Sequence, residues 1–127
     1  MSTQKHEFFD EFKSLYKEKV LKVIASMRIK YFDVLRFIFD ENAEVVEDEF
    51  IEAKVTIILK KSRKDSVKSL RFLFYCKDYL IIIWGDNLDP PPGMPLSRYE
   101  TLFSGSLEEF RNLDLEELFL NRAKPYI

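Results

Sequence analysis

The sequence predicts a single α+β domain in which an antiparallel sheet of three to four strands packs against helices. Residues 49–61 alternate strictly between apolar and polar side chains, which is typical of a strand with one buried face. At both ends of the chain, apolar residues recur every three or four positions, which is typical of helices with one buried stripe. The length of 127 residues suits one domain spanning 1–127, and no linker divides it.

We expect helical structure over residues 4–40, as one helix or as a helix pair. Over residues 4–25 the apolar positions form one stripe, and lysines fall between them. The stripe comprises Phe8, Phe9, Phe12, Leu15, Tyr16, Val20, Val23, Ile24 and Met27. Over residues 27–40 the apolar spacing again fits a helix, although alternate residues at the start of this range would also fit a strand. We favour the helix, ended by residues 40–42.

Residues 49–84 are expected to form the antiparallel strands. In 49–61 the predicted inward side chains are Ile51, Ala53, Val55, Ile57 and Leu59. A second strand over 67–76 places Leu70, Phe72, Phe74 and Cys76 on one side. The run Tyr79–Trp84 is apolar on both faces, which predicts a central strand covered on both sides, with helices from the two chain ends as the cover.

The remaining chain is predicted to be a Gly/Pro-rich segment over 85–105 and C-terminal helices over 106–123. The segment holds all three glycines and four of the five prolines, with a short edge strand near its end. Ser106 and Glu109 have the spacing of a capping box, and Asp114 repeats the start signal. Two short helices packed on the sheet are therefore expected.

Composition limits the function classes. The net charge of −2 gives no overall attraction to nucleic acid or to an anionic membrane. The single cysteine excludes an intramolecular disulfide, and the N-terminal residues lack the apolar run of a signal peptide. We expect a cytoplasmic protein that binds neither a membrane nor nucleic acid directly.

No residue pattern predicts catalysis, so we expect no enzymatic activity. Cys76 is predicted to point into the core, where a thiol is unreactive, and His6 lies near the chain start. The acids of residues 40–52 lack the spacing and the glycine of a calcium loop, and Gly85 is followed by acids rather than by a phosphate cradle. We therefore predict no catalytic residues, no metal site and no cofactor.

The strongest functional signal is an acidic segment over residues 40–52. It contains seven carboxylates and no Lys or Arg. Such a segment attracts basic proteins and competes with nucleic-acid phosphate for their binding sites. The predicted partner-binding residues are Asp40, Glu41, Glu44, Glu47, Asp48, Glu49 and Glu52, with Tyr99 as an anchor. We expect an inhibitor or immunity-type protein, of a bacterial kind, that neutralises a basic toxin or nuclease.

Two other functions stay open. One is a small-ligand-binding or enzymatic domain with its pocket between the sheet and residues 85–105, using Asp86, Asp89, Arg98 or Tyr99. The other is a homodimer formed through spare aromatic surface. A basic cluster over residues 60–71 could contact phosphate, but we favour a solvated turn that protects apolar strands from aggregation.

Overall fold

The computed structural model describes residues 2–61, 67–88 and 99–127. A long N-terminal helix is followed by a meander of antiparallel strands and by short C-terminal helices. The elements are α1 (Ser2–Lys30), β1 (Leu35–Phe39), β2 (Glu44–Val46), β3 (Phe50–Leu59), β4 (Ser69–Lys77), β5 (Leu80–Leu88), β6 (Glu100–Gly105), α2 (Leu107–Asn112), α3 (Leu115–Ala123) and the 3₁₀ turn η1 (Lys124–Tyr126). The predicted α+β class is confirmed.

The strands form one antiparallel sheet in the order β1-β3-β4-β5-β6. The short strand β2 pairs with the start of β3, on the same side of β3 as β1. The sheet therefore has more strands than the predicted three to four. The additional strands, β1 and β2 at one edge, come from chain that the sequence reading assigned to a helix and to an acidic connection.

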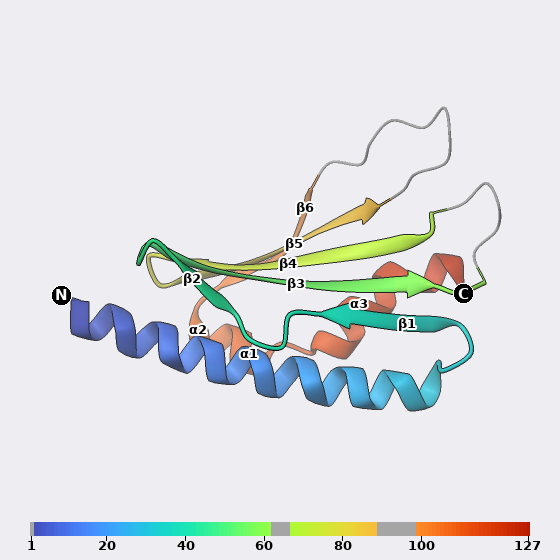
Figure 1. Cartoon of the computed structure of the whole chain (residues 1–127), viewed down its shortest axis with the longest axis horizontal. Coiled ribbons are helices and arrows are strands. Elements are labelled where there is room, and N and C mark those ends of the chain that lie inside the picture. Colours follow the sequence, from blue (N-terminus) through green and yellow to red (C-terminus); the bar gives the residue numbers. More distant parts are fainter. Residues whose placement is uncertain (1, 62–66, 89–98) are drawn as a thin grey trace.

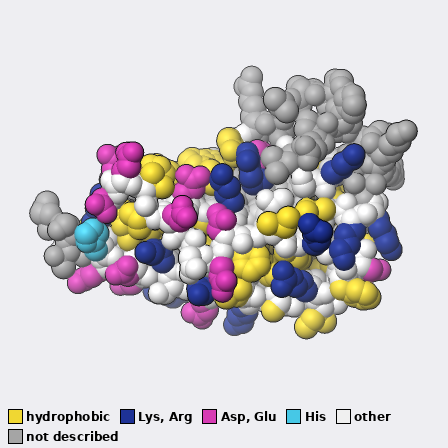
Figure 2. Space-filling view, viewed as in Figure 1, with side chains coloured by type: hydrophobic (Ala, Val, Ile, Leu, Met, Phe, Trp, Pro, Cys, Tyr) yellow, Lys and Arg dark blue, Asp and Glu magenta, His cyan; other side chains and the backbone are white. Residues whose placement is uncertain are grey.

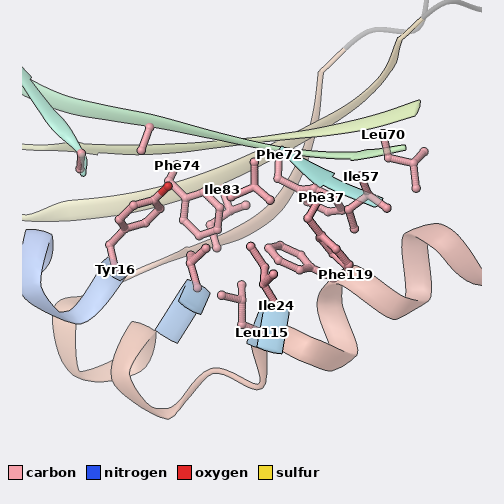
Figure 3. Close-up of a cluster of buried hydrophobic side chains, with 14 of the residues drawn as sticks. Tyr16, Ile24, Phe37, Ile57, Leu70, Phe72, Phe74, Ile83, Leu115 and Phe119 are labelled. Carbon is pink, nitrogen blue, oxygen red and sulfur yellow. The ribbon is translucent and has the colours of Figure 1, made fainter. Parts of the chain in front are cut away.

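All the helices lie on one face of the sheet, with α1 beneath the β1 edge and α3 farther back (Figure 1). The predicted inward residues of β3 and β4 all point to these helices and are buried. Tyr16 and Ile24 of α1 and Phe119 of α3 meet Phe72 and Phe74 of β4 in this core (Figure 3). The ring centroids of Phe72 and Phe119 are 4.4 Å apart, so sheet and helix are in direct contact.

The prediction of helix over residues 31–40 is wrong. The helix ends at Lys30, a turn follows, and residues 35–39 form β1 along β3. In β1 the buried and exposed residues alternate, with Leu35 and Phe37 facing the core. The spacing of Val34, Leu35 and Ile38 fits a helix, but pairing with β3 selects a strand in which Leu35 and Phe37 are the buried residues.

The expectation that helices cover both faces of the central strand is also wrong, because the described helices cover one face only. Asp78 and Tyr79 form the turn between β4 and β5, with φ values of 53° and 64°, so the strand begins at Leu80 rather than at Tyr79. Ile82 and Trp84 lie on the other face and are half-buried. We call this the uncovered face of the sheet.

The two C-terminal helices and their caps are confirmed. Ser106 and Glu109 form the reciprocal bonds of a capping box, and the carboxylate of Asp114 caps α3. Lys19 of α1 donates to the carbonyl oxygens of Arg111 and Leu113, 3.2 and 2.7 Å away, which accept at the end of α2. This contact ties the N-terminal helix to the C-terminal pair.

Candidate protein-binding surface

The acidic segment contains a tight turn at one end of the sheet. The turn joins β2 to β3, and the amide of Glu49 donates to the carbonyl oxygen of Val46 at 2.9 Å. Glu47 and Asp48 have φ values of 52° and 57°, in the left-handed region. Aspartate adopts this region readily, whereas glutamate does so only with backbone strain. All three turn acids are exposed. The β2–β3 hairpin therefore places three exposed carboxylates, those of Glu47, Asp48 and Glu49, on one turn.

The seven predicted acids do not act as one unit. Asp40 is a structural residue: its carboxylate accepts from the amide of Lys54 at 2.8 Å, and its carbonyl oxygen accepts from the Tyr16 hydroxyl at 2.6 Å. Burial, followed by the nearby charge of Asp40, raises the pKa of Tyr16 well above its usual value, so the hydroxyl stays protonated and donates. Four of the seven predicted acids therefore lie outside the turn, and Asp40 among them serves the fold.

Glu41 and Glu52 lie within ion-pair distance of Lys17 and Lys54, at 3.8 and 3.9 Å. By contrast, no basic side chain among the described residues lies within 4 Å of the carboxylates of four exposed acids. These are Glu44, Glu47, Asp48 and Glu49. We call this group, three acids of the turn with Glu44 at the start of β2, the acidic turn. Asp40 has no basic side chain of the described residues within 4 Å either, but its carboxylate accepts from the Lys54 amide.

The acidic turn lies at the acidic end of a molecule whose charges are separated along its long axis. On the face drawn in Figure 2, Asp and Glu gather towards the start of α1, whereas Lys and Arg gather towards the other end. The register places Ile51, Cys76, Ile81 and Gly105 in one row at the acidic end. The turn at Asp78 and the start of α2 therefore lie at that end as well, although Glu108 is already paired with Arg111.

Tyr99 is not part of this surface. Its hydroxyl accepts from Arg71 at 2.7 Å, and Arg71 makes a two-pronged contact with Asp86, at 3.1 and 2.7 Å. In the register Thr56, Arg71 and Asp86 form one row, roughly 20 Å along the strands from the acidic turn. The structure thus joins two residues of the alternative pocket, while Asp89 and Arg98 lie outside the described residues.

The Asp86 carboxylate is buried, and both of its oxygens face the Arg71 guanidinium. The hydrogen bond that Arg71 donates to Asp86, together with the charge of Asp86, holds the pKa of Arg71 above its ordinary value. Arg71 of β4 connects Asp86 of β5 with Tyr99, the residue before β6, through hydrogen bonds. Both carboxylate oxygens of Asp86 are therefore engaged by Arg71.

A row of aromatic rings crosses the uncovered face, and the sequence reading missed it. Phe50, Tyr75, Trp84 and Tyr99 come from β3, β4, β5 and the residue before β6. Successive ring centroids are 5.1, 5.1 and 6.3 Å apart. The available signal was the aromatic residue at the outward positions of three predicted strands.

The remaining sequence candidates are a reactive cysteine, a metal site and a membrane-spanning segment. Cys76 is fully buried, as predicted, and burial raises the pKa of its thiol to about 12, so the nucleophilic thiolate is disfavoured at neutral pH. Within residues 2–61, 67–88 and 99–127, no three His, Cys, Asp or Glu side chains are grouped to hold a metal ion. No helix in the described part of the chain has both the length and the apolar composition needed to cross a membrane.

No protein-family model, curated protein or solved structure matches the chain. The arguments about function below therefore rest on the geometry and charge of the described residues.

Proposed function

We propose that the chain is a non-enzymatic protein-binding module whose acidic turn docks on a basic partner. The observation that carries the proposal is a set of four exposed carboxylates, three on the turn and one at the start of β2, with no basic side chain of the described residues within 4 Å. The pairing of β2 with β3 and the hydrogen bond from Glu49 to Val46 close this turn, which limits the conformational entropy lost when a partner binds. Concentrated charge of one sign accelerates the approach of an oppositely charged partner.

The class of partner follows from this charge. A nuclease or a similar toxin exposes basic side chains where it holds phosphate, and a compact group of carboxylates competes for the same side chains. The proposed role is therefore an inhibitor or immunity-type protein that blocks such a site by charge and shape. A cytoplasmic location is part of the proposal, and the single free thiol of Cys76 supports it.

The test is charge reversal in the turn. The chain is immobilised, basic proteins are captured from an extract of its host, and the strongest binder is purified for kinetic measurements. Changing Glu47, Asp48 and Glu49 together to Lys should slow association by about tenfold or more at low salt, and weaken its salt dependence. Biolayer interferometry at several ionic strengths measures both quantities.

A matched control reverses three exposed acids outside the acidic turn, namely Glu18, Asp33 and Glu117. It changes the net charge by the same amount, so it separates the local effect from the overall one. We expect the control to slow association by no more than about threefold. Equal slowing by both triple variants, or no slowing by the turn variant, contradicts the proposal.

A further inference from the structure

The free edge of β1 has unused backbone hydrogen-bonding groups. The amide of Asp40 donates to Lys54 and that of Lys60 donates to Val34, so even-numbered residues of this strand bond towards β3. In an antiparallel ladder the odd-numbered residues then point the other way. The N–H and C=O groups of Phe37 and Phe39 thus face the free edge, where no other strand of the described chain pairs.

Large apolar side chains are exposed on β1 and on the end of α1 and the turn that precede it. Ile38 of β1 is 51% exposed, and Phe32 and Ile29, just before the strand, are 70% and 81% exposed. Free edges are usually protected by lysine, proline or a bulge, and β1 offers only the charge of Arg36. Figure 2 shows the hydrophobic side chains of this side of the molecule interspersed with Lys and Arg. An exposed apolar edge of this kind is suited to pairing with another strand.

We propose that a second copy of the chain pairs antiparallel with β1 about a two-fold axis. With Ile38 on the axis, Ile38 lies opposite Ile38 of the second copy. Arg36 then lies opposite Asp40 of the second copy, and by symmetry Asp40 lies opposite Arg36 of the second copy. Shifting the register by one step to place Phe37 on the axis sets Arg36 against Ile38 and removes both charge pairs. The edge is therefore complementary to itself in one register.

The charges on this edge are available for such pairing. Arg36 is exposed, and among the described residues no carboxylate lies within 4 Å of its guanidinium. Only Oδ2 of Asp40 is engaged, by Lys54. The antiparallel arrangement also brings the basic end of one copy alongside Glu41 and Glu44 of the other. This charge complementarity is why we assign the edge to a second copy rather than to an unrelated strand.

The first experiment measures mass in solution. Sedimentation equilibrium at micromolar concentrations should give about twice the 15.2-kDa chain mass. Ile38→Lys places two like charges on the axis and should weaken dimerisation by about tenfold or more, whereas the control Leu80→Lys, an exposed apolar residue on the uncovered face, should not. Circular dichroism checks that both variants fold. A wild-type monomer at 100 µM overturns the proposal.

The second experiment tests the register. Ile38 and Ile38 of the second copy would form a non-hydrogen-bonded pair, whose Cα atoms lie about 4.5 Å apart, within the range of a disulfide. Ile38→Cys should therefore form a covalent dimer on mild oxidation, whereas Arg36→Cys should not, and buried Cys76 should not interfere. A dimer that survives Ile38→Lys and does not cross-link through Cys at position 38 uses another surface, and it overturns the proposal. The Ile38 variants leave Glu47, Asp48 and Glu49 unchanged, and the charge reversal in the turn leaves Ile38 unchanged, so the two proposals are tested separately.

Discussion

The two faces of the sheet use the same strands to different ends. On the covered face, Phe72, Phe74 and Ile83 are fully buried against the helices. On the uncovered face, their neighbours Leu73, Ile82 and Trp84 stay half-buried. These half-buried side chains are shielded by one another across the strands, as the ring contact of Tyr75 with Trp84 shows. A strand that is apolar on both faces therefore does not require a helix on each side.

The difference has an energetic consequence. Removing a side chain from the covered face leaves a cavity between two layers, because helix and sheet cannot both close onto it. Removing one from the uncovered face exposes its neighbours to water, which fills the space. Equal truncations on the two faces should thus differ several-fold in their effect on the free energy of unfolding.

The largest expected effect compares Phe72→Ala with its neighbour Leu73→Ala. Phe72 is fully buried against Phe119, so its truncation should lower the free energy of unfolding by about 3–5 kcal/mol. Leu73 is half-buried, and its truncation should cost about 1 kcal/mol. Urea unfolding followed by circular dichroism measures both values. Similar losses for the two variants would show that the uncovered face is packed as tightly as the covered one.

The next effect concerns the one buried ion pair described on the uncovered face. Asp86→Ala leaves Arg71 without its carboxylate in a site where the guanidinium is only partly exposed, so we expect a loss of about 1–3 kcal/mol in unfolding free energy. The control Glu108→Ala removes an exposed helix ion pair and should stay within about 1 kcal/mol. Urea unfolding of the two variants measures both losses. An equal loss of unfolding free energy would mean that the Asp86 contact is no stronger than a surface ion pair.

A smaller effect on the covered face depends on pH. The thiol of Cys76 ionises near pH 9 in the unfolded chain, whereas burial raises its pKa to about 12 in the folded protein. Below pH 9 both states are protonated and stability is unaffected. Above it only the unfolded state loses the proton, so the free energy of unfolding should fall by about 1–2 kcal/mol by pH 10.5. In Cys76→Ala this fall in unfolding free energy above pH 9 should disappear, as urea unfolding at several pH values would measure. An unchanged fall would mean that other groups cause it.

The sequence was sufficient for the elements with a clear period. The alternation in residues 49–61 predicted the buried side of β3, and the capping box at Ser106 predicted the start of α2. It was insufficient for β1, whose five residues are too few to separate a helical period from a strand period. The pairing of β1 with β3 is a contact between distant residues, and such contacts leave no local signal.

The candidate site shows the same limit. Composition located the acidic segment, but only the structure separates the exposed acids of the turn from Asp40, whose carboxylate bonds to Lys54. Tyr99 is predicted from the sequence as an interface anchor in the Gly/Pro-rich segment. The sheet register instead places it beside Arg71, at the other end of the strands. A residue's place along a sheet depends on the pairing of every strand between, which composition does not encode.

The smallest expected effect tests whether the ring row stabilises the uncovered face. Tyr75 and Trp84 are cross-strand neighbours with centroids 5.1 Å apart, and such pairs contribute about 0.5–1.5 kcal/mol beyond their buried area. A double-mutant cycle with Tyr75→Leu and Trp84→Leu should give a coupling energy in this range. A control cycle that combines Tyr75→Leu with a substitution of Leu107, a residue of α2 on the other side of the sheet, should give no coupling energy, since the effects of distant sites are additive. A coupling of zero for the ring pair would mean that each ring acts by its own burial alone.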